Sequence, residues 1–237
     1  MALPKLNVPK YKLKLPSDGR TVNYRPFLVK EEKILLLATE TGEQSDIVVA
    51  IKNIIKDCTD IKDVESLATF DIEYVFLQIR TKSVGESVDI SITCPDDNET
   101  TVAVSIPLDD IKVVKDRKHK SEIKLSDEII ITMGYPNLES FVSMNFADEG
   151  ESGIDQVFQM AVSCMKTIAD AEQVYDCADS TKQELLEFLE QLNSAQFVKI
   201  QEFFETMPKL THTVKVTNPN TGVESEVVLE GLASFFA

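Results

Sequence analysis

The turn Thr93-Cys94-Pro95-Asp96-Asp97 holds the residue types in this sequence that come nearest to a metal site. A zinc ribbon presents C-P-x-C turns at the tips of two hairpins, and their four thiolates hold the metal. Here Asp97 stands in place of the second cysteine, and a second predicted hairpin has Asn218 and Thr221 where its thiols would be. One thiolate cannot hold structural zinc, so we expect at best two turns of this shape whose ligands are replaced.

Other side chains able to do chemistry are sparse. Neither His119, in the basic stretch "KDRKHK", nor His212 has a Ser, Cys or Asp at a spacing typical of a catalytic relay. The carboxylate pairs Asp96-Asp97 and Asp109-Asp110 are expected to be solvated turn residues. Phosphate-binding and zinc-protease motifs are absent. We therefore predict no catalytic residues, no cofactor and no metal, with an enzyme of unrecognised type as the weaker alternative.

Composition indicates a folded protein of the cytoplasm. The 237 residues are 43% hydrophobic, which is enough for a core. No stretch approaches the roughly 20 apolar residues of a membrane span, and "MALPKLNVPKYKLK" lacks the apolar centre of a secretory signal. We predict no membrane partner. The four cysteines have no short pairwise spacing, so reduced, packed thiols are favoured over a disulfide or metal framework.

The net charge of −16 is unevenly distributed. Residues 1–30 carry seven Lys or Arg and only Asp18 as an acid, whereas residues 139–190 carry twelve carboxylates against Lys166 and Lys182. An acidic surface repels phosphate backbones, so we predict no nucleic-acid binding by the body of the protein. The acidic region is either an ordinary solvated surface, which is favoured, or a docking surface for a basic partner.

The first 85 residues are expected to form a hairpin and three helices. "YKLKL" and "TVNYRPF" alternate around "PSDGR", which predicts a hairpin over 10–25. A helix is expected at 29–39, another after a cap at Ser45, and a third in "FDIEYVFLQIRTKSVGE" with Gly85 at its C-terminal cap. The expected buried stripes are Ile47, Ile51, Ile54, Ile55 and Cys58 in the second helix, and Ile72, Val75, Phe76 and Ile79 in the third.

The rest of the chain alternates between β and helical patterns. Residues 86–133 are predicted to be β-rich. Helices are expected after caps at Ser152 and Ser180 and from about Ser194 to Pro208, and the tail is expected to be a hairpin followed by a short aromatic helix. The expected buried faces of these helices are Ile154, Val157, Phe158, Ala161, Val162 and Met165, then Leu185, Phe188, Leu189 and Leu192, then Phe197, Ile200, Phe204 and Met207.

These patterns favour an α+β fold in which helical bundles combine with antiparallel β-hairpins. The expected segments are a basic arm and hairpin at 1–28, helices at 29–85, a β-rich region at 86–136, an acidic helical region at 137–207, and a hairpin with an aromatic helix at 208–237. Thr93-Cys94-Pro95 and Thr217-Asn218-Pro219 form a weak internal repeat. It raises the alternative of two related lobes, although turn chemistry alone also produces it.

Three phrases of the sequence resemble a known family. "YRPFLVKEEKILLLATE", "LATFDIEYVFLQIRTKSVGESV" and "VVLEGLASFF" are similar to the baseplate hub assembly proteins of T-even-type contractile-tailed bacteriophages. The resemblance implies a non-enzymatic late protein that assembles the central hub in the host cytoplasm, as a chaperone or as a component kept in the virion tail. Its implied partners are other hub proteins. Oligomeric state does not follow from it. An acidic mimic of nucleic acid that inhibits a host DNA-binding enzyme is the alternative.

Six residues are the candidates for partner binding: Arg25, Phe27, Lys30, Lys33, Phe235 and Phe236. Pro26 restricts the backbone ahead of the first helix, and the acids that follow suit the positive end of the helix dipole. The segment is therefore either a well-formed helix start or, with the basic arm, a docking surface for acidic hub proteins. For the two C-terminal phenylalanines, packing against the protein's own last hairpin is favoured over insertion into a partner.

Overall fold

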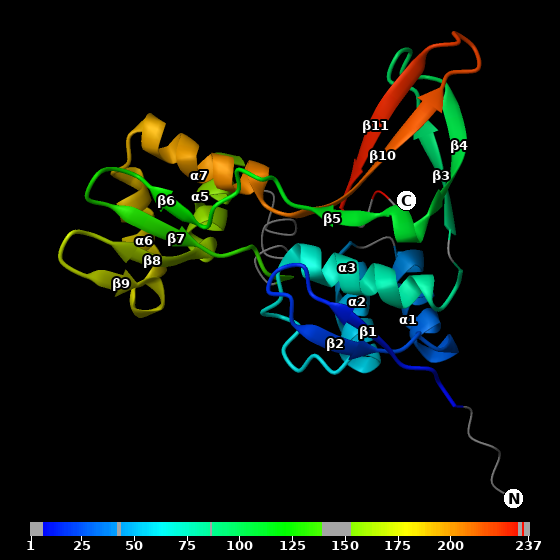
Figure 1. The fold of residues 1–237 in the computed structure, drawn as a ribbon, viewed down its shortest axis with the longest axis horizontal. Coiled ribbons are helices and arrows are strands. Elements are labelled where there is room, and N and C mark those ends of the chain that lie inside the picture. The colour runs from blue at the N-terminus through cyan, green and yellow to red at the C-terminus, as the bar shows by residue number, and fades with distance from the viewer. Residues whose placement is uncertain (1–6, 42–43, 86, 139–152, 232–233, 235–237) are drawn as a thin grey trace, which may run out of the picture. The chain divides into compact units, whose positions relative to one another are not determined.

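The computed structural model describes residues 7–41, 44–85, 87–138, 153–231 and 234, and it divides the chain into two compact units (Figure 1). Unit 1 holds the residues up to Val114 and those from Lys209 onward, and unit 2 is Lys115–Pro208. All strand pairs are antiparallel, so the α+β prediction is confirmed. The units do not follow the five expected segments, because the 86–136 segment contributes strands to both.

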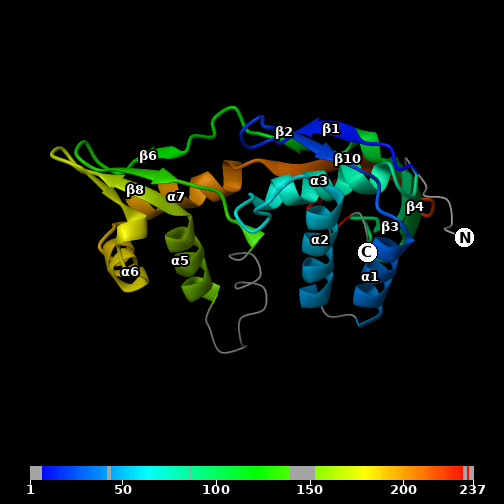
Figure 2. The same cartoon turned by 90° about the horizontal axis from the view of Figure 1, so that it is seen from below.

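The described part of unit 1 contains the helices α1 (Val29–Thr41), α2 (Gln44–Cys58) and α3 (Thr69–Thr81). Figure 2 shows α1 and α2 side by side. The stripe predicted on α3 is buried at all four positions, and so are Ile54, Ile55 and Cys58 of α2. Because apolar residues spaced by three and four share one face of a helix, both helices bury that face in the core of unit 1. The cap predicted at Gly85 is wrong, since α3 ends with Lys82 as its C-cap residue.

The described residues of unit 1 also form three hairpins. They are β1 (Tyr11–Lys14) with β2 (Thr21–Tyr24), β3 (Ser87–Thr93) with β4 (Thr101–Pro107), and β10 (Lys209–Thr217) with β11 (Glu224–Glu230). The short strand β5 (Lys112–Val114), which follows the 3-10 turn η1 (Leu108–Asp110), pairs with β10. Helix α3 contacts both β5 and β10. The first and last parts of the chain therefore form one sheet-and-helix unit.

The three hairpin turns share one hydrogen-bond pattern. Each begins with a residue followed by proline, and the carbonyl of that residue accepts from the amide four positions later, at 2.8 to 2.9 Å. The accepting residues are Leu15, Cys94 and Asn218, and the donors are Gly19, Asn98 and Gly222. All three donors have positive φ, at 73°, 55° and 74°. Glycine and asparagine tolerate this left-handed conformation, which explains their place in the turns.

The weak internal repeat is part of this shared turn pattern. Both of its members, the β3–β4 and β10–β11 hairpins, lie in unit 1 rather than in separate units. The β1–β2 hairpin has the same turn without belonging to the repeat. The similarity between Cys94-Pro95 and Asn218-Pro219 is therefore accounted for by turn chemistry.

Unit 2 is a four-stranded sheet with helices packed against it. Its strands are β6 (Glu122–Lys124), β7 (Ile130–Met133), β8 (Met165–Ala169) and β9 (Val174–Asp176), which pair in that order. Its described helices are α5 (Gly153–Cys164), α6 (Lys182–Glu190) and α7 (Ser194–Thr206), with the 3-10 turn η2 (Cys177–Asp179) before α6. Helices α6 and α7 begin with reciprocal capping boxes, Thr181 with Glu184 and Asn193 with Gln196.

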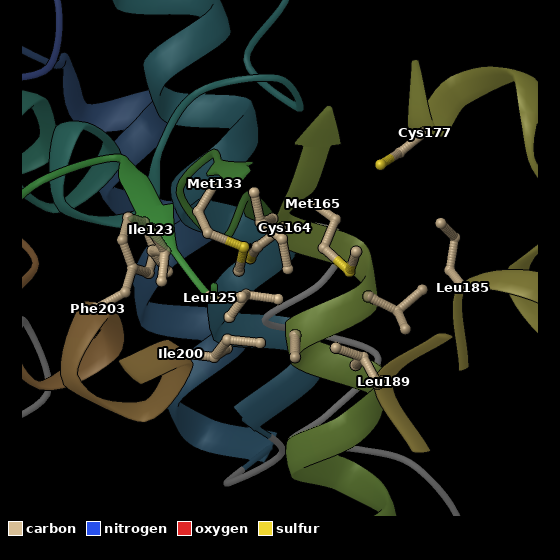
Figure 3. Close-up of a cluster of buried hydrophobic side chains, with 13 residues drawn as sticks. Ile123, Leu125, Met133, Cys164, Met165, Cys177, Leu185, Leu189, Ile200 and Phe203 are labelled. Carbon is tan, nitrogen blue, oxygen red and sulfur yellow. The ribbon is translucent and has the colours of Figure 1, made fainter. Parts of the chain in front are cut away.

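The core of unit 2 is made by one face of the sheet and the three helices. Figure 3 shows its labelled side chains, among them Met133 from β7, Leu185 and Leu189 from α6, and Phe203 from α7. Ile131 and Ala161, which belong to this core, are fully buried. The helix spacing predicted for Leu185, Leu189 and Ile200 is confirmed by their burial.

The expected acidic helical region differs from the structure in several places. It contains the strands β8 and β9, which the sequence did not predict, and Met165 belongs to β8 rather than to the preceding helix. Val157 is 40% exposed instead of buried. The cap of α6 is Thr181, not Ser180. The caps predicted at Ser45 and Ser152, the side chains of Ile47 and Ile154, and the aromatic helix apart from Ser234 lie outside the described residues or side chains.

Candidate functional site

Arg25 joins the end of β2 to the end of α2. Its Nη2 donates to Glu31 Oε1 at 2.8 Å and to the backbone carbonyl of Asp57 at 3.0 Å, and its Nη1 donates to the carbonyl of Pro26 at 2.9 Å. The backbone amide of Arg25 donates to the carbonyl of Cys58 at 2.9 Å. A guanidinium has five N–H donors in a rigid fork, so one side chain can hold three segments together.

Glu31 is the buried partner in this arrangement, with a side chain only 1% exposed. Besides Arg25 it accepts the backbone amide of Leu28 at 2.8 Å and lies 3.0 Å from Lys30 Nζ. Burial alone would raise the pKa of the Glu31 carboxyl, but the hydrogen bonds from Arg25, Leu28 and Lys30 outweigh it and lower the pKa to about 2. The carboxylate is therefore ionised throughout the neutral range and fixes the first turn of α1.

Phe27 lies in the core of unit 1. The residue is 7% exposed, and its backbone amide donates to Ser83 Oγ at 2.9 Å. Ser83 Oγ in turn donates to the carbonyl of Ile79 at 2.6 Å, in the last turn of α3. The segment Arg25-Pro26-Phe27 thus connects the first hairpin, α1, α2 and α3, and its sequence is explained by this local structure.

Helix α1 has one packed face and one apolar exposed face. Glu31 and Ala38 are buried on the packed face. The exposed face, which we call the α1 surface, consists of Val29, Lys33, Ile34, Leu36 and Leu37. Val29 is 78% exposed and Leu37 is 52% exposed. Apolar side chains gathered on one exposed helix face are typical of a surface that contacts another protein.

The predicted partner-binding residues separate in the structure. Arg25 and Phe27 are held in the packing of unit 1, whereas Lys30 has a 65% exposed side chain and Lys33 is exposed beside the apolar residues of the α1 surface. Phe235 and Phe236 lie outside the described residues. The docking role stays a prediction for all six. The apolar exposed face was not predicted, although the helical spacing of Val29, Lys33 and Leu37 in the sequence contains it.

The two turns singled out for their likeness to zinc turns are hydrogen-bonded to each other. Asn218 Nδ2 donates to Asp97 Oδ2 at 2.8 Å and to the two carboxylate oxygens of Asp96 at 3.0 and 3.1 Å. Thr221 Oγ1 donates to Asp96 Oδ2 at 2.5 Å, and Asn220 Nδ2 donates to Thr100 Oγ1 at 2.9 Å. We call these contacts the turn-tip cluster. It joins the tips of the β3–β4 and β10–β11 hairpins through side-chain hydrogen bonds.

The turn-tip cluster also fixes the ionisation of its acids. Hydrogen bonds from the side chain and backbone of Thr100, and then from Asn218, lower the pKa of the Asp97 carboxyl far below its ordinary value. Asn218 itself is 1% exposed. Among the described residues, no three His, Cys, Asp or Glu side chains are grouped so that they could hold a metal ion. The cluster is thus built from amide and hydroxyl donors to carboxylates.

The remaining candidates for chemistry have structural partners. His119 is 8% exposed, with Nδ1 3.1 Å from Thr206 Oγ1 and Nε2 3.1 Å from the Tyr135 hydroxyl. His212 faces Leu229 across the β10–β11 pair. All four cysteines are buried and free of disulfides, as predicted. Burial raises the pKa of the Cys58 and Cys164 thiols to about 11, which keeps them protonated near neutral pH.

In the part of the chain that the structure describes, no helix is both long enough and apolar enough to cross a bilayer.

Comparison with known proteins gives a family and a relative. The family described as "T4 bacteriophage base plate protein" matches residues 8–237. The baseplate hub assembly protein gp26 of Enterobacteria phage T4 is 25% identical over 227 residues, which cover 96% of this chain and 98% of the relative. No solved structure matches the chain.

Proposed function

Because the chain belongs to the family of T4 bacteriophage base plate proteins, we propose that it acts in assembling the central hub of the tail baseplate. It does so through contacts with other hub proteins and without catalysing a reaction. It is either an assembly factor that works in the host cytoplasm or a component that stays in the baseplate of the virion.

This proposal rests on the length of the alignment with the T4 relative. A shared module would align over one part of each protein, whereas here the alignment covers 98% of a relative that is named for hub assembly. Both units of this chain have their counterpart within that alignment, since it includes 96% of the chain. The expected role is therefore that of a whole protein of the same kind.

The α1 surface supports a role that depends on protein contacts. Val29 and Leu37 are more than half exposed, so a partner that covers them removes apolar area from water. Each fully covered aliphatic side chain contributes about 1.5–3 kcal/mol, and about 1.4 kcal/mol changes an affinity tenfold. Covering two such residues is therefore expected to strengthen a complex at least tenfold.

Co-expression with the hub proteins tests the proposal. The chain should elute with at least one hub protein in size exclusion, and the variant Val29→Ser/Leu37→Ser should weaken that complex at least tenfold. A matched control is Val84→Ser/Val228→Ser, which alters two other residues of unit 1 that are 58% and 60% exposed. A chain that co-elutes with no tail protein contradicts the proposal. Equal weakening by both variants contradicts the assignment to the α1 surface.

The contribution of the basic residues is tested separately. If Lys33 contacts an acidic hub protein, Lys33→Glu should weaken the complex, and the weakening should shrink as salt rises because screening reduces the attraction. Lys62→Glu is the control, since Lys62 is also an exposed lysine of unit 1. We prefer Lys33 to Lys30 for this test because Lys30 also pairs with the buried Glu31.

The two possible places of action are separated by mass spectrometry. Purified virions and the lysate of infected cells are compared for peptides of this chain. Its presence in virions assigns it to the finished baseplate, and its presence in the lysate alone assigns it to assembly. Affinity capture from uninfected host extract tests the alternative of an acidic mimic, because only a mimic should recover a host DNA-binding enzyme.

A further inference from the structure

Unit 2 has an open pocket beside the β6–β7 hairpin, with a volume of about 440 Å³. We call it the cationic pocket. Its lining residues are Lys115, His119, Lys120, Ser121, Glu122, Lys124, Ile130 and Tyr135. Three lysines and one carboxylate line it, so its own charge is positive.

The positive charge is unusual for this part of the protein. Unit 2 carries eight Lys or Arg against eighteen Asp or Glu, and five of the eight cations fall within residues 115–124. Only two of the eighteen acids, Asp116 and Glu122, lie in that stretch. The cations are thus concentrated in the short stretch that contributes three lysines to the pocket, and the acids of unit 2 lie mostly outside that stretch.

Two of the pocket lysines have no carboxylate partner in the part of the chain that the structure describes. Lys124 Nζ lies 2.9 Å from Asp127, whereas neither Lys115 nor Lys120 makes an ion pair with a described residue. Their ammonium groups are exposed at the pocket. A negatively charged ligand can therefore bind these two ammonium groups without breaking an ion pair to a described residue.

The wall of the pocket is rigid and partly apolar. His119 is fixed by hydrogen bonds to Thr206 and Tyr135, and its ring stacks on Tyr135 at 5.6 Å between centroids and contacts Phe203 at 4.9 Å. Burial and the nearby Lys115 lower the pKa of His119, so its imidazole is neutral at pH 7. Ile130, which is 38% exposed, adds an aliphatic contact. The wall therefore offers neutral and apolar atoms between the lysines.

We infer that the cationic pocket binds a short acidic segment of a partner protein. Carboxylates spaced along a peptide can reach Lys115, Lys120 and Lys124 in turn, and an apolar side chain beside them can contact Ile130 and Tyr135. A nucleic acid is the poorer fit, because unit 2 outside residues 115–124 carries sixteen acids against three cations, and this net negative charge repels a phosphate backbone. This inference rests on the proposed function only in taking the occupant to be a protein.

A peptide of six glutamates labelled with fluorescein is the probe, and its anisotropy is measured with the full chain at low ionic strength. Lys115→Gln/Lys120→Gln/Lys124→Gln should weaken binding at least tenfold. Lys10→Gln/Lys12→Gln/Lys14→Gln makes the same change of charge at exposed lysines of unit 1 and should stay within twofold of the unmodified chain. Thermal melts of both variants should match that of the unmodified chain, since all six lysines are exposed.

Several outcomes would overturn the inference. The first is that the probe does not bind. The second is that both triple variants weaken binding equally, because binding would then depend on the net charge of the chain and not on a specific site. A hexathymidylate that binds more tightly than the peptide would assign the pocket to nucleic acid. Complete displacement of the peptide by inorganic phosphate at equal charge concentration would assign it to a free anion.

A second readout places the peptide at the pocket. The chain has only two histidines, so their ring proton resonances are assigned with one variant, His212→Gln. The His119 resonance should shift as the peptide is added, while the His212 resonance of unit 1 stays in place. A shift of His212 alone contradicts the site. No baseplate protein is present in these experiments, so their failure would leave the proposed hub role standing.

Discussion

Asn218 donates its side-chain amide to the carboxylate of Asp97 at 2.8 Å, and this contact joins two hairpin tips that are 121 residues apart in the chain. The same amide reaches both oxygens of Asp96. In a zinc ribbon the corresponding tips are held by a metal that all four ligands share. In this protein an asparagine that is 1% exposed donates to both carboxylates, and hydrogen bonds join the tips.

Asn218 should therefore be important for the stability of unit 1. Asn218→Ala removes the donor from two carboxylates and should cost about 1–3 kcal/mol of unfolding free energy. Asn218→Asp should cost more at neutral pH, because it places a third carboxylate beside Asp96 and Asp97, and part of that cost should be recovered as the solution is acidified. Denaturant unfolding at two pH values measures both effects. An Asn218→Asp variant as stable as the unmodified chain would show that the turn-tip cluster does not depend on this donor.

The Arg25–Glu31 pair predicts how stability depends on acid. The folded-state pKa of Glu31 is about 2, below its ordinary value of 4.5, so its contribution is complete above pH 4.5 and is lost as the pH falls toward 2. That contribution is about 3 kcal/mol, since one pKa unit corresponds to about 1.4 kcal/mol. The stability difference between the unmodified chain and Glu31→Gln should therefore shrink across this window. A difference that stays constant with pH would contradict the assignment to Glu31.

Arg25 should be more costly to remove than an ordinary surface arginine. Arg25→Met leaves the buried Glu31 with Lys30 as its remaining cation and frees the carbonyl of Asp57, and we expect a loss on the order of 3 kcal/mol. Arg20→Met is the control, because Arg20 pairs with Asp18 through side chains that are both more than half exposed. Thermal unfolding should separate the two variants clearly, and equal melting temperatures would refute the structural role of Arg25.

The shared turn pattern predicts opposite effects at two equivalent positions. Asn98 has φ of 55° where the other two turns have glycine, so Asn98→Gly should be neutral or stabilise by a few tenths of a kcal/mol. Gly222→Ala should destabilise by about 1 kcal/mol, because alanine is strained at φ of 74° even though its Cβ meets no atom within 4 Å. Denaturant midpoints measure both. A stabilising Gly222→Ala would contradict the assigned backbone conformation.

One experiment decides whether the C-terminal phenylalanines pack on this protein or on a partner. If Phe235 and Phe236 cover the protein's own last hairpin, as we predict, Phe235→Ala/Phe236→Ala should cost roughly 3 kcal/mol or more of folding stability. If they insert into a partner instead, the melting temperature should stay unchanged while affinity for the hub complex falls at least tenfold. Thermal melts of the isolated variant distinguish the two, and an unchanged melt would make this tail the first place to look for the partner.

The sequence by itself determined the features that depend on neighbouring residues. The helical spacing of Ile72, Val75, Phe76 and Ile79 predicts α3 and its buried face, and both are found. The turn at residues 15–20 follows from Pro16 and Gly19, whose backbone preferences act within the turn itself. The family could also be recognised from the sequence, because the resemblance depends on short phrases in a fixed order and not on contacts between distant residues.

Only the tertiary structure decided the features that depend on residues far apart in the chain. Met165–Ala169 follows a helix in a region of helical pattern, yet it forms β8 because β7 and β9 are on either side to complete its hydrogen bonds. Asn218 donates a hydrogen bond to Asp97, and Lys115 lines the same pocket as Ile130. Folding brings these residues together, and their spacing in the sequence does not indicate either contact. Phe27 is buried against elements that follow it by up to 56 residues. Strand pairing, buried hydrogen bonds and pockets are formed by residues far apart in the chain. The local spacing of apolar residues therefore does not predict them.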